Sequence, residues 1–386
     1  MKAYRFTVPT PVYFGDNCVK DNAAMICALG KKAFIVTQKF IGGCRNHALD
    51  DIEEIFKANG IAYQINDDAE ENPPVESIAA IAKIARAYDP DFIVGIGGGS
   101  ALDTAKAVNF LLTRDPEEDP YVSFFGGNGS FYGSAKLPKD EGKLPYIAIP
   151  TTAGTGSEVT AGAVLTRVDT DTKDTPPCKL YFTAAFLDAR YIEESPSFLI
   201  HTGVMDALAH GMETYVNTHS NFMNRSMAEI GFKLFAEFKD TMLNDCATHE
   251  DYEKMLIAAN VMGMAFAQAG TTLPHGMGYP LSHHKGLNHG LSCSITLGEY
   301  MRGFKDTSKI QRAIELCGFK TVDAFADYVN EIIRRDVHIS VTRGEIDQWA
   351  EEFYQLKDRL ARHPEPISQE DIRQIYLRSL APYIAD

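Results

Sequence analysis

An aspartate and a histidine stand four residues apart at Asp206 and His210, so on a helix both side chains project from the same face. Further imidazoles follow along the chain, at His275, His283, His284 and His289. One carboxylate and several imidazoles make a ligand set for Zn²⁺, Fe²⁺ or a similar divalent ion. A surface pair would also explain Asp206 and His210 taken alone, so it is their combination with the later histidines that predicts a metal enzyme.

The residues beside two of these histidines predict how they are presented. Pro274 precedes His275, and a glycine follows both His275 and His289 directly. Because proline and glycine favour turns, we expect tight turns that aim both imidazoles inward. We expect His283 and His284 to lie around the ligands or at the edge of a pocket rather than to bind the ion.

A second feature is a run of three glycines and a serine between a predicted strand and a predicted helix, at Gly97, Gly98, Gly99 and Ser100. Glycines let the backbone approach a phosphate, and the start of a helix offers free N–H groups. Ser100 and Asp103 have the spacing of a capping box, which would close that helix start. The run is not the GxGxxG fingerprint, and a plain glycine-rich turn would also fit it.

Another predicted strand is followed by a segment rich in hydroxyl groups, with Thr151, Thr152, Thr155 and Thr160. Hydroxyls and flexible backbone suit phosphate and ribose oxygens. Two such loops at the ends of neighbouring strands would form the ligand crevice of an α/β sheet. Together the two loops predict a dinucleotide site.

Apolar runs alternate with amphipathic stretches in the first half of the chain. Strands are predicted at 33–37, 61–65, 91–96 and 144–150, and helices at 46–59, 74–88 and 100–112. This alternation is typical of a parallel α/β sheet. The stretch 114–143 is acidic and then glycine-rich, without periodicity, and we expect a long surface excursion there.

Long helical periods dominate after about residue 196, for example at 224–243 and 252–268. The sequence therefore predicts two domains. The first, at 1–195, is an α/β dinucleotide-binding domain, and the second, at 196–386, is an all-helical metal-binding domain.

Charge and composition narrow the class of protein. The chain has 386 residues and a formal net charge of −15, which argues against nucleic acid or an anionic membrane as a partner. Seven cysteines without a CxxC pair indicate reduced thiols and a cytoplasmic location. The first residues lack the apolar stretch of a secretory signal, and no run of about 18 apolar residues predicts a membrane span.

Four segments resemble the iron-containing, group III, alcohol dehydrogenase family, at 97–106, 150–158, 205–210 and 275–289. The resemblance runs from about residue 12 to about residue 298 and keeps the family's order of motifs. It implies the architecture shared with dehydroquinate synthase: an α/β nucleotide-binding domain, an all-helical domain and a catalytic metal in the cleft between them. It also implies NAD(H) or NADP(H) as cofactor and Fe²⁺ as metal, with Zn²⁺ as the alternative because the general affinity order favours it.

The resemblance assigns roles residue by residue. It places the metal ligands at Asp206, His210, His275 and His289. It implies cofactor contacts at Gly97, Gly98, Gly99, Ser100, Asp103, Thr151, Thr152, Thr155 and Thr160. Lys173 falls where the family has a ribose-contacting lysine, although the adjacent Thr175-Pro-Pro177 is unusual.

Three positions depart from the family's pattern. Tyr279 stands where a second histidine commonly follows the third ligand by four residues, and a phenol can relay a proton in its place. Ala161 and Gly162 replace the usual Pro-Asn, which enlarges that corner of the pocket. Gln38 occupies a position that is often acidic in NAD-preferring relatives, so the sequence allows NADP(H) as well as NAD(H).

The expected reaction is reversible hydride transfer between nicotinamide C4 and a primary alcohol or aldehyde held by the metal, which acts as a Lewis acid. We expect the proton to leave through water, the ribose hydroxyls, Tyr279 or His283, and Phe266 to form a wall of the pocket. A homodimer is the expected assembly, with the extended segment Tyr4–Val8 pairing across a twofold axis.

Other functions fit some of the same residues. A lyase like dehydroquinate synthase would need several basic residues in the cleft, and the segment 273–291 offers only Lys285. An enzyme like glycerol dehydrogenase would use zinc and fewer ligands, which the fourth donor, His289, disfavours. A non-enzymatic nucleotide- or metal-binding protein would bind a cofactor that no alcohol reduces.

Overall fold

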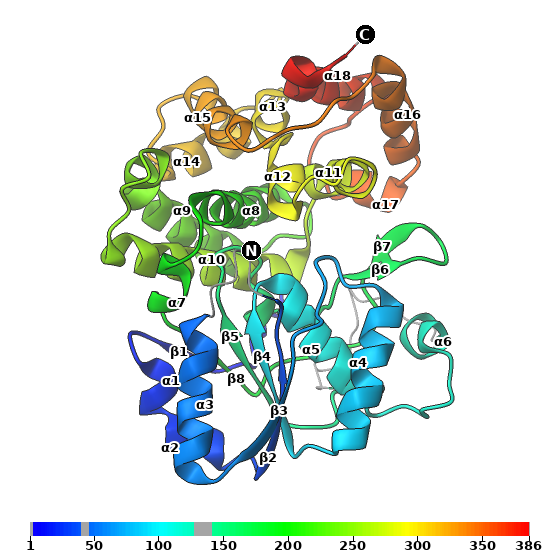
Figure 1. Cartoon of the computed structure of the whole chain (residues 1–386). Coiled ribbons are helices and arrows are strands. Elements are labelled where there is room, and N and C mark those ends of the chain that lie inside the picture. Colours follow the sequence, from blue (N-terminus) through cyan, green and yellow to red (C-terminus); the bar gives the residue numbers. More distant parts are fainter. Residues whose placement is uncertain (1–2, 40–45, 127–140, 386) are drawn as a thin grey trace. The chain divides into compact units, whose positions relative to one another are not determined.

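The computed structural model describes residues 3–39, 46–126 and 141–385 (Figure 1). The chain divides into two units. One unit comprises Thr7–Ser195, and the other comprises Pro196–Asp386 together with Met1–Phe6.

The first unit contains a six-stranded parallel sheet with the strand order β1-β8-β5-β4-β2-β3. Its strands are β1 (Val12–Phe14), β2 (Lys32–Val36), β3 (Ala62–Asn66), β4 (Phe92–Gly97), β5 (Tyr146–Pro150) and β8 (Ala184–Leu187). A separate antiparallel hairpin joins β6 (Leu165–Arg167) to β7 (Thr172–Asp174). Every residue of β4 and β5 is buried, as expected of parallel strands covered on both faces.

Helices cover both faces of this sheet, with α1 to α3 on one side and α4 to α6 on the other (Figure 1). The helices of this unit are α1 (Cys18–Asp21), α2 (Ala23–Cys27), α3 (His47–Asn59), α4 (Val75–Tyr88), α5 (Gly99–Leu111), α6 (Pro120–Phe125) and α7 (Arg190–Glu193). On the first side, Val19, Ile52 and Phe56 of the helices join Ile35 and Val94 of the strands in one buried apolar cluster. Removing this apolar surface from water is what holds the layers together.

Local signals explain why the predicted helices lie close to the observed ones. Helix α3 begins after Asn46, whose side chain accepts a hydrogen bond from Ala48 N at 2.8 Å, and it ends at Gly60 with a φ of 64°. The helices predicted at 46–59, 74–88 and 100–112 agree with α3, α4 and α5 to within one residue at each end. The predicted α/β class is confirmed.

The surface excursion predicted at 114–143 contains a short helix, α6. This helix starts at Pro120, and the preceding Asp119 accepts a hydrogen bond from Tyr121 N at 2.8 Å. Six residues are too few to show a helical repeat, so periodicity could not reveal it. Residues 127–140 of the excursion lie outside the described residues.

The second unit consists of helices, as predicted. Three long ones, α8 (Ser197–Val216), α9 (Phe222–Leu243) and α10 (His249–Ala269), pack against one another. They are followed by α11 (Leu273–His284), α12 (His289–Ser294), α13 (Leu297–Arg302), α14 (Ser308–Leu316), α15 (Val322–Arg334), α16 (Arg343–Tyr354), α17 (Lys357–Leu360) and α18 (Gln369–Leu380). Among the described residues, no single helix could cross a membrane by length and composition; the pair α10 and α11, bent by 103°, meets those two criteria only when taken together.

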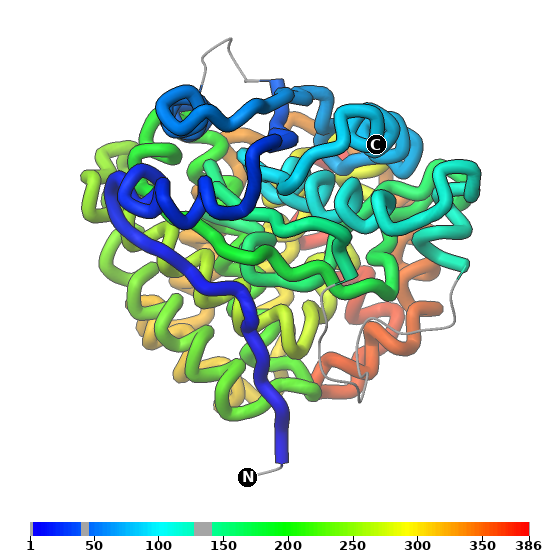
Figure 2. Tube along the Cα trace, turned by 90° about the horizontal axis from the view of Figure 1, so that it is seen from below, coloured from blue at the N-terminus to red at the C-terminus, as the bar shows by residue number. Residues whose placement is uncertain are grey.

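The segment at the start of the chain runs extended, as its trace in Figure 2 shows. Residues 3–9 belong to no strand of the structure. The segment Tyr4–Val8, which we expected to pair across a twofold axis, therefore forms no strand of a sheet within the described part of this chain.

Candidate metal centre and dinucleotide loops

Helix α8 carries three ionisable side chains on one face. Asp206, His210 and Glu213 follow one another at spacings of four and three residues, which places them side by side. Each of the three is at most 5% exposed. Buried ionisable groups are costly unless they pair with each other or bind a metal, so this face indicates a site rather than ordinary packing.

His275 and His289 each lie at the start of a helix. His275 lies in the first turn of α11, just after Pro274. His289 is the first residue of α12, where the Asn288 side chain accepts a hydrogen bond from Gly290 N at 3.0 Å. The expected tight turns are therefore wrong, because Pro274 lies in the first turn of a helix, where proline is tolerated.

The glycines near these histidines let three helices approach one another closely. A Cβ on Gly278 of α11 would lie 2.5 Å from the backbone oxygen of Ser292 in α12. A Cβ on Gly290 of α12 would lie 2.2 Å from the backbone oxygen of Thr202 in α8. Only glycine fits such contacts, and the close packing brings the imidazoles of α11 and α12 to the polar face of α8.

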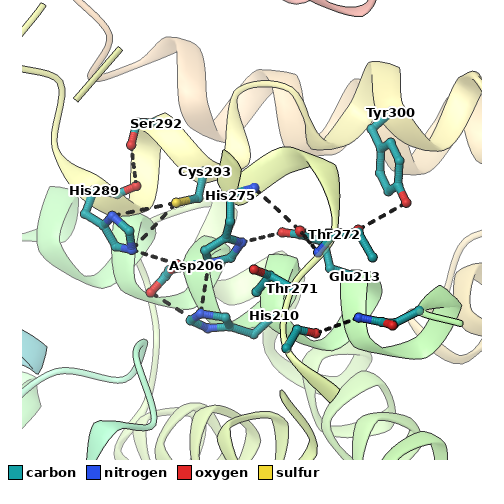
Figure 3. Close-up of polar contacts among 12 residues, drawn as sticks. Asp206, His210, Glu213, Thr271, Thr272, His275, His289, Ser292, Cys293 and Tyr300 are labelled. Atoms are coloured by element: carbon teal, nitrogen blue, oxygen red, sulfur yellow. Dashed lines mark hydrogen bonds and ion pairs between the residues drawn. The ribbon is translucent and has the colours of Figure 1, made fainter. Parts of the chain in front are cut away.

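The polar atoms of the three helices converge, as Figure 3 shows. His275 Nε2 lies 2.9 Å from His210 Nε2 and 3.3 Å from Asp206 Oδ1. His289 Nε2 lies 3.9 Å from the same oxygen of Asp206. The structure therefore brings together all four residues that the sequence suggested as metal ligands.

Glu213 orients His275 and was not singled out from the sequence. One carboxylate oxygen contacts His275 Nδ1, and the other accepts hydrogen bonds from the backbone N of Thr272 at 2.7 Å and from its hydroxyl at 3.3 Å. An ionised carboxylate has no proton to give, so Nδ1 donates and Nε2 keeps its lone pair toward Asp206 and His210. A carboxylate behind a metal-binding histidine commonly sets its tautomer in this way. The seven-residue spacing from Asp206, two turns along α8, could have revealed Glu213.

This donor set fits a divalent cation better than it fits a hydrogen-bonded cluster. Asp206 Oδ1 is buried and accepts no hydrogen bond, although the Nε2 atoms of His275 and His289 lie 3.3 and 3.9 Å away. The facing Nε2 atoms of His210 and His275 could share at most one proton. A cation among these lone pairs would satisfy every one of them.

The electrostatics of the cluster also favour a positive charge at its centre. Burial raises the pKa of Asp206, but His210, His275 and His289 lower it by more, so this carboxylate stays ionised. Burial lowers the pKa of His275, but Cys293, Glu213 and Asp206 raise it well above its usual value. The negative groups around His275 therefore favour a positive charge there.

Cys293 adds a sulfur atom that was not singled out from the sequence. It is buried on α12 one turn after His289, and its Sγ lies 3.6 Å from His289 Nε2. Donor atoms of Asp206, His275, His289 and Cys293 all lie within 4.8 Å of one another. Burial raises the pKa of Cys293, but His275 and His289 lower it further, to about 7. The four-residue spacing from His289 is the signal that could have revealed it.

In the first unit, the two glycine- and threonine-rich loops lie against each other. Strands β4 and β5 are parallel neighbours, and just beyond them Thr151 N donates a hydrogen bond to Gly97 O at 3.0 Å. Gly97 has a φ of 143°, which other residues rarely adopt. A Cβ on Gly99 would lie 2.6 Å from Thr155 Cγ2, so glycine is required there as well.

Gln38 and Thr152 lie at the same edge of the sheet. A Cβ on Gly98 would touch Thr152 Cγ2 at 3.3 Å, and one on Gly97 would lie 3.8 Å from Gln38 Oε1. Three strand ends, those of β2, β4 and β5, therefore bring their following residues together. This is the edge at which parallel α/β sheets bind ligands.

The predicted capping box of Ser100 and Asp103 is wrong. Helix α5 begins after Gly98, and no side chain caps it. Ser100 Oγ instead accepts a hydrogen bond from Asn72 N at 3.2 Å, and Asn72 Oδ1 accepts one from Lys173 Nζ at 2.8 Å. Asn72, which was not singled out from the sequence, thus ties Lys173 on β7 to the start of α5.

Asp103 and Thr160 meet at the fully buried Lys106. Its Nζ lies 2.7 Å from Gly162 O, 2.8 Å from Ser157 Oγ and 3.3 Å from Thr160 Oγ1. Asp103 lies 3.4 Å from the same Nζ and accepts a hydrogen bond from Ser157 Oγ at 2.6 Å. This network fixes the second loop to α5.

Replacing Lys106 with methionine is expected to destabilise the first unit by about 3 to 5 kcal/mol, because Asp103 would remain as a largely buried carboxylate without its cation. Denaturant unfolding followed by circular dichroism measures the change. Lys83→Met, on the exposed face of α4, is the matched control and should shift stability by less than about 0.5 kcal/mol. Equal stabilities of the two variants would contradict the role given to the network.

Two family models together match nearly the whole chain. The model of the iron-containing alcohol dehydrogenases matches residues 9–189, and the model of the C-terminal part of the Fe-containing alcohol dehydrogenase family matches residues 199–380. The chain belongs to the iron-containing alcohol dehydrogenase family. The resemblance inferred from the four sequence motifs is confirmed.

Relatives in this family match the chain over almost its full length. The NADPH-dependent butanol dehydrogenase of Clostridium saccharobutylicum is 28% identical over 96% of this chain and 97% of its own. The structure of an iron-containing alcohol dehydrogenase from Thermotoga maritima is 31% identical, with a TM-score of 0.83 over 98% of this chain and 100% of that one. Sulfoacetaldehyde reductase from Bifidobacterium kashiwanohense, solved in complex with NAD⁺, is 26% identical, with a TM-score of 0.81 over 98% of this chain and 99% of that one.

In this family member Phe266 of α10 lies directly against a proposed ligand. Its ring stacks on that of His210, with centroids 4.2 Å apart and an angle of 9° between the planes. The His275 ring also lies close to the His210 ring, with the two centroids 4.4 Å apart. Phe266 therefore forms a wall beside the candidate metal centre and holds the orientation of one imidazole.

The two proton-transfer candidates lie along α11. Tyr279 follows His275 by one helical turn, and its hydroxyl accepts a hydrogen bond from Arg359 at 3.0 Å. Arg359, which was not singled out from the sequence, also lies over the Tyr279 ring, 4.9 Å from its centroid. His283 lies one turn further along, is exposed and contacts the ring of His284.

Proposed function

We propose that the chain is a metal-dependent, NAD(P)-linked alcohol dehydrogenase that transfers a hydride reversibly between nicotinamide C4 and a primary alcohol or its aldehyde. The observation that carries the proposal is the convergence of Asp206 with three imidazoles, one of which Glu213 orients with Nε2 toward the centre. Membership of the iron-containing family supports the same activity. In this proposal the helical region 196–386 binds the metal, and the α/β region 1–195 binds the dinucleotide.

We propose that Asp206, His210, His275 and His289 hold Fe²⁺, with Zn²⁺ as the alternative ion. When bound, the ion supplies Lewis acidity toward the substrate oxygen. Asp206 contributes the negative charge of the set, and His275 keeps its proton on Nδ1 through Glu213. Phe266 excludes water from one side of His210.

Tyr279 and His283 are the residues that we propose to move the proton, together with water. Arg359 donates to the Tyr279 hydroxyl oxygen, so the phenol keeps its own O–H for a second partner. His283 is exposed and can exchange a proton with solvent. The chain thus offers a route along α11 in place of the histidine that is common at position 279.

We propose that the dinucleotide binds at the strand ends of the α/β unit, through Gln38, Gly97, Gly98, Gly99, Ser100, Asp103, Thr151, Thr152, Thr155, Thr160 and Lys173. Gln38 is uncharged, so both NAD(H) and NADP(H) are allowed. Lys39, which follows it, pairs with Asp68 at 3.1 Å, and Asp68 lies opposite Gln38 in an antiparallel bridge. The lysine thereby offsets the charge of a nearby carboxylate.

Gln38→Asp is expected to lower the catalytic efficiency with NADPH relative to NADH by at least about fivefold, since a like charge near the 2′-phosphate costs about 1 to 4 kcal/mol at close range. The ratio of kcat/KM for the two cofactors measures the effect. Gln38→Asn, which keeps the site neutral, is the matched control and should leave the ratio close to that of the unchanged protein. An unaltered ratio in Gln38→Asp would show that residue 38 does not face the 2′ position.

The experiment that tests the proposed activity is anaerobic purification, metal analysis and an absorbance assay of NADH or NADPH oxidation with butanal. Metal-dependent oxidation of either cofactor is the expected result, and it also determines cofactor preference. A protein that carries stoichiometric metal but oxidises neither cofactor with any of a broad panel of aldehydes would overturn the proposal.

We further propose a homodimer and a cytoplasmic location. The segment Tyr4–Val8 runs extended outside any strand, as a segment that pairs with a second copy would. The six cysteines that the structure describes are all free thiols, which fits a reducing compartment. A monomer mass in light scattering would exclude the dimer.

A further inference from the structure

The thiol of Cys293 points into the proposed metal centre. Cys293 follows His289 by one turn of α12, and its Sγ lies 3.7 Å from His289 Nδ1 and 3.6 Å from His289 Nε2 (Figure 3). The residue has no exposed surface. A buried, inert thiol normally packs among apolar groups, whereas this one lies beside the imidazoles of His275 and His289.

The donor atoms lie close enough together to converge on a single ion. Sγ of Cys293 and one donor atom each of Asp206, His275 and His289 lie within 4.8 Å of one another. Zn–S and Zn–N bonds of about 2.3 and 2.0 Å place neighbouring donors roughly 3.5 Å apart in a tetrahedral site. A modest contraction of side chains would therefore bring all four into bonding distance of one ion.

A second observation points to the same centre. Asp206 Oδ1 is buried among these residues and accepts no hydrogen bond. A buried carboxylate oxygen without a hydrogen bond is costly, and a cation bound there removes the cost. The thiol of α12 and the carboxylate of α8 therefore lie within 4.8 Å of each other and could bind the same ion.

We propose that Cys293 binds the catalytic metal as a thiolate, as a fifth donor beside the four residues Asp206, His210, His275 and His289. The inference rests on the proposed metal centre and deepens it. On binding, the S–H bond breaks, a sulfur–metal bond forms and the proton leaves to the buffer. A thiolate is a soft ligand, so it shifts the preference of the site from Fe²⁺ toward Zn²⁺.

X-ray absorption of the zinc-loaded full chain tests this directly. A sulfur neighbour at about 2.3 Å from zinc is expected. A shell of nitrogen and oxygen alone, in a protein that holds stoichiometric zinc, would overturn the inference and leave the proposed metal centre intact. A protein that binds no metal at all would overturn both, so the two failures are distinguishable. The measurement on the unchanged protein does not depend on the folding of any variant.

Variants supply an independent test through affinity and spectra. In Cys293→Ser the thiolate-to-metal charge-transfer band of the Co²⁺-loaded protein should disappear, and zinc affinity should fall by at least about tenfold. Affinity for Fe²⁺ should fall less, because the loss removes a soft donor. Cys246→Ser, which changes an exposed cysteine of the same unit, should keep the band and the affinity. A band of unchanged intensity in Cys293→Ser would overturn the inference.

Discussion

His275→Ala is expected to lose at least about 100-fold in turnover and to bind metal far more weakly, while remaining folded. The side chain makes the shortest contacts in the centre, 2.9 Å to His210 and 3.3 Å to Asp206. Its loss removes one proposed ligand, so that only the donors on α8 and α12 remain and α11 contributes none. Even residues that only support a ligand can cost 10- to 100-fold in metal affinity or activity, so loss of a ligand should cost no less.

Glu213 keeps part of its hydrogen bonding in this variant, which is why the fold should survive. Thr272 still donates to the carboxylate at 2.7 Å. Circular dichroism and metal analysis are to be measured with the kinetics. His338→Ala, an exposed histidine of the same unit, is the control and should behave as the unchanged protein. Full activity in folded His275→Ala would exclude the proposed centre.

Glu213→Gln is expected to weaken metal binding by about 10- to 100-fold and to lower turnover accordingly. The amide is nearly the same size as the carboxylate, so packing is preserved and only hydrogen-bond donors change. One carboxylate oxygen accepts from His275 Nδ1, and the other accepts from Thr272 N. Whichever way the amide is turned, its NH₂ group must face one of these two donors. If the NH₂ group faces His275, the imidazole must change tautomer and carry its proton on Nε2. If it faces Thr272, the buried backbone N–H of Thr272 loses its acceptor.

Titration of the apoprotein with Co²⁺ or Zn²⁺ measures this effect separately from catalysis. Glu237→Gln, which alters a half-exposed carboxylate paired with Lys254 at 3.0 Å on the surface of the same unit, is the matched control. An affinity of Glu213→Gln equal to that of the control would show that the carboxylate does not orient the ligand.

Local spacing was enough to find residues that share one helix. Asp206 and His210 are four residues apart, and their common face on α8 follows from helix geometry alone. The same rule would have found Glu213, three residues beyond His210, and Cys293, four beyond His289. A single glutamate or cysteine near a histidine is a common pattern in sequences, and only burial distinguishes these two.

Two local inferences were wrong because tertiary contacts decide what a residue does. Ser100 and Asp103 have capping-box spacing, yet Asp103 is drawn to the buried Lys106, and Ser100 bonds to Asn72. The glycine at 290 suggests a turn from the sequence, yet together with Gly278 it permits close packing of α11, α12 and α8. Apart from Lys106, the competing partners lie far away in the sequence, among them Ser157, which donates a hydrogen bond to Asp103 at 2.6 Å.

The amino-acid sequence by itself determined the α/β and all-helical classes, the order of the elements and the family, because periodicity, caps and short motifs are local properties. Only the tertiary structure decided that Glu213 orients His275, that Asn72 holds Lys173 and that Cys293 lies beside Asp206, His275 and His289. These contacts join segments tens of residues apart. Their distances follow from how the glycine-bearing helices pack, and packing is a property of the whole core rather than of any single segment.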